Sequence, residues 1–361
     1  MSFQKSDGMN YAPQGKPKPV VKPGEFVFAA AHLDHGHIYG QTNGLLEAGA
    51  QLKWVYDSDP AKVAAFLKAY PQAKPAASLD EILNDSEVKL VANAAVPCDR
   101  GPIGCRIMEA GKDYFTDKAP FTTLEQLEKA REVAARTDRK YMVYYSERLH
   151  VECAVFAGDL IKQDAIGRVV QVLGLGPHRL NAPSRPKWFF EKDKYGGIVC
   201  DIGSHQIEQF LSFAGATNAT VLHSAVGNYN NPDYPELEDF GEASLVADNG
   251  VSNYFRVDWL TPDGLRIWGD GRTIILGTKG YIELRKYIDI AAEEQKGDNL
   301  LLVNEQGEKR FDLSGKVGFP FFGQLIMDCL NRTEHAMTQA HAFKAAELCL
   351  IAQAQAKRLV G

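Results

Sequence analysis

The sequence lacks the features that mark several classes of protein. None of its six cysteines forms a Cys-x-x-Cys pair, and their wide spacing is typical of reduced thiols in the cytoplasm rather than of a disulfide scaffold. The apolar run at residues 26–32 is far too short to span a bilayer. The formal net charge is −6, so the composition offers no basic surface to a nucleic acid or an anionic membrane. We therefore expect a cytoplasmic protein whose partners are small molecules and further copies of itself.

The composition that is present is that of an ordinary globular protein. Of the 361 residues, 45% are hydrophobic and 24% charged, and this length corresponds to about two domains. Residues 1–24 carry four lysines and four prolines but no apolar core of a signal peptide. We expect these residues to form a flexible leader or an arm laid on a neighbouring subunit.

Two different sequence patterns follow one another along the chain, and they predict two domains. Within residues 25–148, short apolar runs alternate with helical patterns, which predicts an α/β domain with a doubly wound parallel sheet. Within residues 149–361, strand-like segments are separated by turn signals such as Asp248-Asn249-Gly250, and helical patterns return after Pro320. This second part predicts an α+β domain with a large, mostly antiparallel open sheet.

The loop after the first predicted strand is where a doubly wound domain binds the pyrophosphate of a dinucleotide. Here residues 32–37 read His-Leu-Asp-His-Gly-His, so the glycine fingerprint is absent and only the place in the fold indicates a cofactor. Three histidines also suggest a metal site, but we interpret them as polar loop side chains that face a ligand or solvent, and assign no metal ligand. The candidate cofactor contacts in this loop are His32, Asp34, His35 and His37.

Three further residues follow predicted strands of the same domain. Asp57 ends the second strand, where a carboxylate accepts hydrogen bonds from ribose hydroxyls and repels a 2′-phosphate, which favours NAD over NADP. A strand-end carboxylate in a turn with Asp59 is the alternative. Pro97 and Lys118 complete the candidate cofactor contacts. Lys118 could also hold a substrate hydroxyl and relay its proton, unless it is a surface lysine before a helix.

Residues 195–205 are the most informative segment. Asp201 and His205 lie four residues apart, so on a helix they would share one face. A carboxylate beside an imidazole suits a general base that takes a hydroxyl proton, although this spacing also occurs in surface pairs and metal sites. Before them comes a polar and aromatic tract that suits a polyhydroxylated ligand, or else is a loop with packed aromatics. Its candidate substrate contacts are His178, Arg179, Arg185 and Trp188.

Two motifs together resemble the glucose–fructose oxidoreductase and inositol dehydrogenase (Gfo/Idh/MocA) family. Residues 117–119 read Asp-Lys-Ala with Pro120 one place late, where the family has Glu-Lys-Pro, and residues 196–205 match its Gly-Gly-x-x-x-Asp-x-Gly-x-His motif. The resemblance implies an N-terminal Rossmann domain and an NAD(P)-dependent oxidoreductase, NAD rather than NADP, acting on a sugar, cyclitol or related polyol. It also implies that the second domain binds substrate and mediates oligomerisation to a homodimer or homotetramer, and that Lys118, Asp201 and His205 form the catalytic group.

Two other functions fit the same fold. Some relatives oxidise a sugar transiently to cleave a glycosidic bond, which predicts a tightly held NAD without net turnover. A non-catalytic protein that senses a sugar or a nucleotide would explain the missing glycines, but it would have no need for Lys118, Asp201 and His205 together.

Overall fold

The computed structural model describes residues 8–292, 294 and 296–360, and the chain divides into two compact units. The parallel-sheet unit comprises Met9–Tyr144 and Phe319–Phe343. The large-sheet unit comprises the described residues within Tyr145–Gly318 and residues 344–360, together with Gly8.

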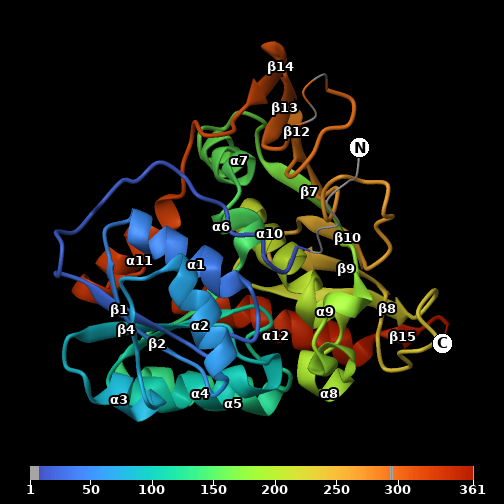
Figure 1. Ribbon diagram of the computed structural model, residues 1–361. Coiled ribbons are helices and arrows are strands. Elements are labelled where there is room, and N and C mark those ends of the chain that lie inside the picture. The colour runs from blue at the N-terminus through green and yellow to red at the C-terminus, as the bar shows by residue number, and fades with distance from the viewer. Residues whose placement is uncertain (1–7, 293, 295, 361) are drawn as a thin grey trace. The chain divides into compact units, whose positions relative to one another are not determined.

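The parallel-sheet unit contains six parallel strands in the order β3-β2-β1-β4-β5-β6. The strands are β1 (Val27–Ala31), β2 (Gln51–Tyr56), β3 (Lys74–Pro75), β4 (Val88–Asn93), β5 (Asp113–Asp117) and β6 (Tyr141–Tyr144). The helices are α1 (His37–Glu47), α2 (Pro60–Ala69), α3 (Leu79–Asn84), α4 (Pro97–Glu109), α5 (Leu124–Thr137) and α11 (Pro320–Asn331). Helices α1 and α4 lie on opposite faces of the sheet (Figure 1). The predicted doubly wound α/β fold is therefore confirmed.

Three strands of this sheet are buried along their whole length. Every residue of β1, β5 and β6 is buried, as expected for parallel strands covered by helices on both faces. The order reverses between β1 and β4, both of which continue into loops at their carboxyl ends. In open α/β sheets, ligands bind in the crevice at such a reversal.

The chain returns to the parallel-sheet unit near its C-terminal end. The sequence did not indicate this return, because it predicted a continuous second domain over residues 149–361. The segment Phe319–Phe343 instead belongs to the parallel-sheet unit. The Phe322 ring packs against Phe115, and the Arg332 guanidinium donates to the Asp113 carboxylate at 2.8 Å. These partners lie some 200 residues away in sequence, so the local pattern of the helix could not indicate them.

The N-terminal segment also lies against this unit. The backbone amides of Lys18 and Val20 donate to the carbonyl oxygens of Glu47 and Ala48, and the Gly15 amide donates to the Glu47 carboxylate. The part of the predicted leader that the structure describes therefore runs along α1 of its own chain. Residues 1–7 lie outside the described residues.

The large-sheet unit contains nine strands in the order β14-β13-β12-β11-β7-β10-β9-β8-β15. The strands are β7 (Val169–Pro177), β8 (Ala219–Gly227), β9 (Phe240–Ala247), β10 (Ser252–Asp258), β11 (Arg272–Gly277), β12 (Gly280–Arg285), β13 (Asn299–Asn304), β14 (Gly307–Asp312) and β15 (Lys357–Arg358). Only the pairs β7–β10 and β8–β15 are parallel, so the predicted mostly antiparallel sheet is confirmed. The hairpin β13–β14 was not predicted.

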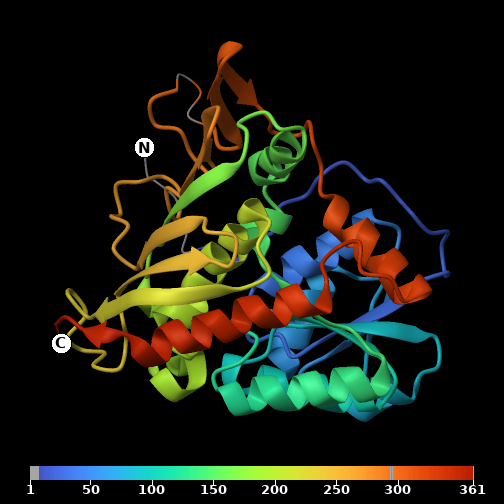
Figure 2. The same ribbon diagram turned by 180° about the vertical axis from the view of Figure 1, so that it is seen from behind.

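Helices cover one face of this sheet. They are α6 (Ser146–Leu149), α7 (Glu152–Lys162), α8 (Lys192–Tyr195), α9 (Ile198–Asp201), α10 (Gly203–Ala214) and the C-terminal helix α12 (Gln339–Gln355), which begins in the other unit. Helix α10 packs against β7, β9 and β10, which Figures 1 and 2 show from two sides. Among the residues described, no helix is both long and apolar enough to cross a membrane.

Candidate functional site

The loop after β1 departs from the usual backbone of a non-glycine residue. His32 has a φ of 57°, in the left-handed region that favours glycine. It stands directly after Ala31, where the first glycine of a dinucleotide fingerprint would be. Its amide donates to the Tyr56 carbonyl and its carbonyl accepts from the Ala94 amide, so it joins the ends of β2 and β4. His32 therefore has the left-handed backbone that glycine adopts readily, although the residue is a histidine.

The glycine that remains in this loop serves another contact. A Cβ atom at Gly36 would lie 2.3 Å from the carbonyl oxygen of Met9, so only glycine lets the N-terminal segment pass this closely. Gly36 is the N-cap of α1, which follows the carboxyl end of β1, and the His37 and Ile38 amides donate to His35 Nδ1 and to the His35 carbonyl.

Asp57 is fixed at the end of β2 by two backbone amides. Its Oδ2 accepts from Leu33 at 2.6 Å and its Oδ1 accepts from Asp59 at 2.8 Å. Each carboxylate oxygen has a second lone pair, so both can still accept a hydroxyl hydrogen. Nearby, Lys62 forms an ion pair with Asp34. Asp57 is thus placed and oriented as an acceptor at the edge where the sequence predicts the ribose.

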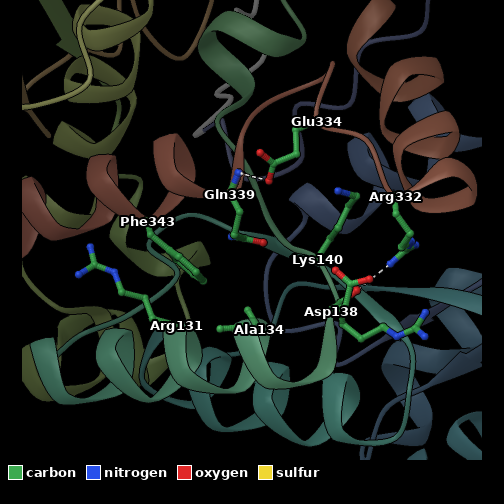
Figure 3. A pocket seen from close by; sticks show the side chains of 10 residues that line it. Arg131, Ala134, Asp138, Lys140, Arg332, Glu334, Gln339 and Phe343 are labelled. Carbon is green, nitrogen blue, oxygen red and sulfur yellow. Dashed lines mark hydrogen bonds between the residues drawn. The ribbon is translucent and has the colours of Figure 1, made fainter.

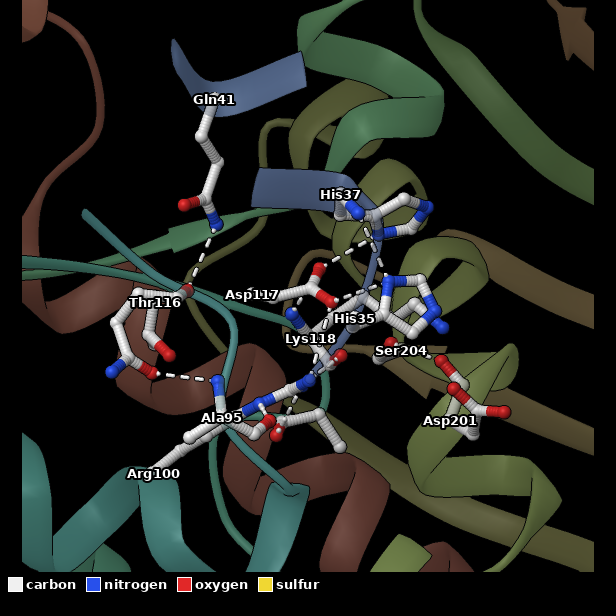
Figure 4. Close-up of polar contacts among 12 residues, drawn as sticks. His35, His37, Gln41, Ala95, Arg100, Thr116, Asp117, Lys118, Asp201 and Ser204 are labelled. Atoms are coloured by element: carbon white, nitrogen blue, oxygen red, sulfur yellow. Dashed lines mark hydrogen bonds and ion pairs between the residues drawn. The ribbon is translucent and has the colours of Figure 1, made fainter. Parts of the chain in front are cut away.

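Four side chains form a buried group that we call the Asp117 cluster: Asp117, His35, His37 and Arg100. The Asp117 Oδ1 lies 2.8 Å from His37 Nδ1, and its Oδ2 lies 3.3 Å from both His35 Nδ1 and an Arg100 amino nitrogen (Figure 4). The His37 amide donates to His35 Nδ1 at 3.1 Å, and the Lys118 amide donates to Asp117 Oδ1 at 2.8 Å. The cluster thus links the loop after β1 to the end of β5.

The electrostatics of this cluster follow from its burial. Burial alone would raise the pKa of Asp117, but His37 and then Arg100 hold it well below its usual value. Burial, and next the neighbouring His37, holds the pKa of His35 well below its usual value, so that this imidazole is neutral at pH 7. Asp117 is therefore the ionised centre of the cluster.

The same cluster has the spacing of a metal site but the charge of an anion site. The ligand atoms of His35, His37 and Asp117 all lie within 4.8 Å of one another. However, two buried cationic side chains adjoin the cluster: Arg100 lies 3.3 Å from the Asp117 carboxylate, and the charge of Lys118 acts on His35. A divalent cation would add to this positive charge, whereas a phosphate group would balance it. The residues present therefore fit the pyrophosphate of a dinucleotide.

Arg100 holds the segment that carries Lys118. Its guanidinium donates to the Ala95 carbonyl at 2.6 Å and to the carbonyls of Lys118 and Ala119, and its side chain is fully buried. Lys118 follows β5 at the carboxyl edge of the sheet, and Pro97 is the first residue of α4 at the same edge. Sequence reasoning missed Arg100; the available signal was a lone arginine on the otherwise small and apolar face of α4.

In the large-sheet unit, the glycine–aspartate–histidine motif spans two short helices. Asp201 ends α9 and His205 lies in the first turn of α10; they are 7% and 2% exposed. Gly197 has a φ of 90°, and a Cβ there would lie 2.3 Å from the Gln353 side chain, so this position needs glycine. Ile202, whose backbone is itself helical, separates the two helices. The pairing of Asp201 with His205 stays a prediction.

The predicted substrate tract combines stacked rings with arginines that hold loop carbonyls. His178 packs against the rings of Trp259 and Trp268, and its Nδ1 lies 3.1 Å from the Gly176 carbonyl oxygen. Trp188 is half-buried, and its ring packs at a tilt beside Phe189. The segments after β7 and β10 thus contribute aromatic rings that pack together.

The two arginines of the tract face inward. Arg179 donates to the Pro262 carbonyl at 3.0 Å and to that of Leu265, and Arg185 donates to the Leu180 carbonyl at 2.9 Å. Both are buried, so they shape the loop itself. Their contact with substrate stays a prediction.

A cavity of about 520 Å³ lies elsewhere in the parallel-sheet unit, between α5 and the segment that joins α11 to α12 (Figure 3). Several of its polar groups bond to the protein: Gln339 bonds to the backbone of Tyr141 in both directions, and Lys140 donates to the Thr333 carbonyl. It contains none of the predicted site residues.

Family models match both parts of the chain. An oxidoreductase-family model with an NAD-binding Rossmann fold (GFO/IDH/MocA) matches residues 31–145, and a model of the GFO/IDH/MocA C-terminal domain matches residues 156–283. Among curated relatives, D-xylose dehydrogenase of Paenarthrobacter nicotinovorans is 24% identical over 150 residues, 40% of this chain and 38% of that protein. The oxidoreductase YhhX of Escherichia coli, itself uncharacterised, is 29% identical over 186 residues, 50% of this chain and 51% of that protein. The chain thus matches only about two fifths to one half of these relatives.

Solved structures match over nearly the whole chain. A protein from Erwinia carotovora atroseptica, described only provisionally as an oxidoreductase, is 50% identical with a TM-score of 0.89, covering 93% of this chain and 100% of that one. An aldose-aldose oxidoreductase from Caulobacter crescentus, solved with glycerol, has a TM-score of 0.74 at 18% identity, covering 92% and 97%. A levoglucosan dehydrogenase solved with NADH and levoglucosan has a TM-score of 0.72 at 17% identity, covering 91% and 96%. The last two likenesses show a shared fold.

Proposed function

Because the chain belongs to the Gfo/Idh/MocA family of NAD-binding oxidoreductases, we propose that it transfers a hydride between NAD and a hydroxyl-bearing carbon of a sugar, cyclitol or related polyol. The observation that carries this proposal is the Arg100 clamp, which fixes the Lys118 segment at the ligand-binding edge of the parallel sheet. Because a buried arginine fixes the backbone of the segment that carries Lys118, we infer that the position of Lys118 is important for the reaction.

The cofactor is held by residues at the carboxyl ends of β1, β2, β4 and β5. The loop with His32, Asp34, His35 and His37 and the start of α1 take the pyrophosphate, while Asp57 takes the ribose hydroxyls and disfavours NADP. Pro97 and Lys118 border the same edge. When bound, NAD supplies the nicotinamide that accepts or returns the hydride.

Lys118, Asp201 and His205 form the acid–base group. His205 or Lys118 takes the proton of the substrate hydroxyl, and Asp201 orients the imidazole. His178 and Trp188 offer aromatic faces to the sugar, with Arg179 and Arg185 beside them. The named substrates of relatives, D-xylose and levoglucosan, support the class of ligand but not its identity.

The protein forms a homodimer or homotetramer through the outer face of its large sheet. Ile274 and Leu276 on β11 and Tyr281 on β12 are 36–44% exposed on that face, and Leu276 pairs directly with Tyr281 across the strands. Exposed apolar side chains that adjoin one another on a sheet are typical of an interface.

The protein works in the cytoplasm. All six cysteines are thiols rather than members of a disulfide, and five of them are buried. Thiols persist in this form in a reducing compartment.

Nucleotide binding tests the proposal directly. The purified protein is titrated with NAD, NADH, NADP and NADPH, and a denatured sample is assayed for released nucleotide. Saturable binding of NAD or NADH with weaker NADP binding is expected, followed by reduction at 340 nm in a screen of sugars and cyclitols. A nucleotide that resists dialysis without net turnover would indicate the glycosidase-like reaction. No binding at all would contradict the enzyme assignment and favour a sensor.

A further inference from the structure

Glu147 is a buried carboxylate of the large-sheet unit that the proposed reaction does not use. It lies on α6 and is 2% exposed. Its Oε2 accepts from Lys286 Nζ at 2.9 Å, Gln206 Nε2 at 3.0 Å and Gln209 Nε2 at 3.4 Å. Its Oε1 is buried too but has no hydrogen-bond partner among the described residues. Such an oxygen is costly, because an ionised group away from water normally has every acceptor satisfied.

The partners of Glu147 lead to the turn that carries His205. Gln206 follows His205 directly on α10, and Gln209 donates to the His205 carbonyl at 2.8 Å. Lys286, which follows β12, also donates to Gln209 Oε1 at 2.6 Å. The carboxylate, the ammonium and the two amides therefore form one buried network beneath the first turn of α10.

The charge of Glu147 reaches the imidazole as well as the backbone. Burial alone would raise the pKa of Glu147, but Lys286 and then His205 lower it to about 2. His178, after β7, acts in the same direction more weakly. Since interactions between charges are mutual, an ionised Glu147 favours the protonated form of His205.

A second charged pair lies beside this network. Arg148, the next residue on α6, donates from Nε to both Glu208 carboxylate oxygens at 2.9 Å. Lys286 opposes the effect of Glu147 on the pKa of His205, but its ammonium donates to Gln209 as well as to Glu147. Among the residues that the structure describes, the second carboxylate oxygen of Glu147 has no hydrogen-bond donor.

We propose that Glu147 is a positioning residue for His205: with Lys286 and Gln209 it fixes the first turn of α10, and its charge stabilises the imidazolium formed when His205 takes the substrate's proton. This inference rests on the proposed function. In the step it concerns, the O–H bond of the substrate breaks and an N–H bond forms on His205. Glu147 stays ionised throughout and receives no proton.

The test follows the His205 imidazole itself, without turnover. The full-length protein is labelled with ¹³C at the histidine Cε1 position, His205 is assigned with His205→Gln, and its pKa is measured by NMR titration in wild type and Glu147→Gln. We expect the pKa of His205 to fall by at least about one unit, a tenfold change in proton affinity. A change below about 0.3 units would overturn the proposal.

Glu208→Gln is the matched control, since it removes a second buried carboxylate of the same unit but leaves Glu147 in place. The pKa of His205 should then stay close to that of the wild type; an equal fall in both variants would reduce Glu147 to a structural role. If Glu147→Gln does not fold, Lys286→Gln tests the same electrostatics with the opposite sign, because removing the ammonium should raise the pKa of His205. A fall in that variant would also contradict the proposal.

Kinetics provides the second measurement. In Glu147→Gln, the acidic limb of kcat/KM should move to lower pH by the same amount as the pKa of His205, with nucleotide affinity unchanged. A protein that binds no nucleotide would refute the proposed function, yet the NMR result would still decide the coupling of Glu147 to His205.

Discussion

Asp117 in the parallel-sheet unit and Glu147 in the large-sheet unit are both buried carboxylates beside histidines, but their surroundings satisfy them differently. Asp117 has donors or positive groups at both oxygens: the Lys118 amide and His37 at one, Arg100 at the other. Glu147 has three donors on one oxygen and, among the described residues, none on the second. The first carboxylate completes a structural clamp, whereas the second retains an unbalanced charge.

A buried carboxylate therefore acts on its surroundings in one of two ways, depending on whether both of its oxygens have partners. A fully satisfied buried carboxylate rigidifies its neighbours, because any movement would break several strong hydrogen bonds at once. An incompletely satisfied carboxylate costs stability and acts on nearby titratable groups through the low dielectric of the interior. Asp117 thus holds the Lys118 segment, and Glu147 sets the charge around His205.

The largest effect is expected when the contact between Asp117 and Arg100 is broken. Asp117→Asn should lower the free energy of unfolding by about 3 kcal/mol, because it leaves the Arg100 guanidinium buried without a counter-charge. Urea denaturation measures the loss. Asp80→Asn is the control, since Asp80 pairs with Arg106 on the surface and should change stability by less than about 1 kcal/mol. Similar values for the two variants would show that Asp117 is not a clamp.

Removing the proposed general base, His205, should slow catalysis but leave cofactor binding unchanged. His205→Ala should lower kcat by about 10²-fold or more, since a general base is lost, while NAD affinity stays nearly unchanged. Steady-state kinetics and a nucleotide titration of the same sample measure both. His223→Ala, at a half-exposed position on β8, should retain activity. Full activity of His205→Ala would remove His205 from the catalytic group.

The neutral state of His35 predicts a pH dependence of stability. Because burial, and next His37, lowers the pKa of His35 in the folded protein, the unfolded chain binds more protons below pH 6.5. Stability should therefore fall as the pH drops from 6.5 toward the folded pKa, by up to about 1.4 kcal/mol per pH unit. His35→Gln should flatten this slope in urea denaturation at pH 7.5 and 5.5. His335→Gln, at an exposed position, should keep the wild-type slope.

The smallest effect concerns cofactor choice. Asp57→Ala should narrow the preference for NAD over NADP by about tenfold, because a carboxylate that repels the 2′-phosphate is lost. Fluorescence titration with both nucleotides measures the ratio of dissociation constants. Asp59→Ala removes only the cap of α2 and should leave the ratio unchanged. An unaltered ratio in Asp57→Ala would mean that the ribose is recognised elsewhere.

Much of the fold could be predicted from local patterns. The apolar run that became β1 and the turn signals that separate the strands of the large sheet indicated each element close to its place. The hairpin β13–β14 was missed because β14 is mostly exposed and polar, so it shows no alternation. The clamp at Arg100 was missed because its partners are backbone carbonyls, which no side-chain motif records.

By itself, the sequence determined the order of strands and helices, the place of the cofactor loop and the motif around Asp201 and His205, since periodicity and spacing are local properties. Only the tertiary structure decided which charges meet. Glu147 and Lys286 are 139 residues apart, and Asp117 lies 80 residues from His37. The strength of these two interactions depends on the exclusion of water by the packed chain, and water is excluded only after folding.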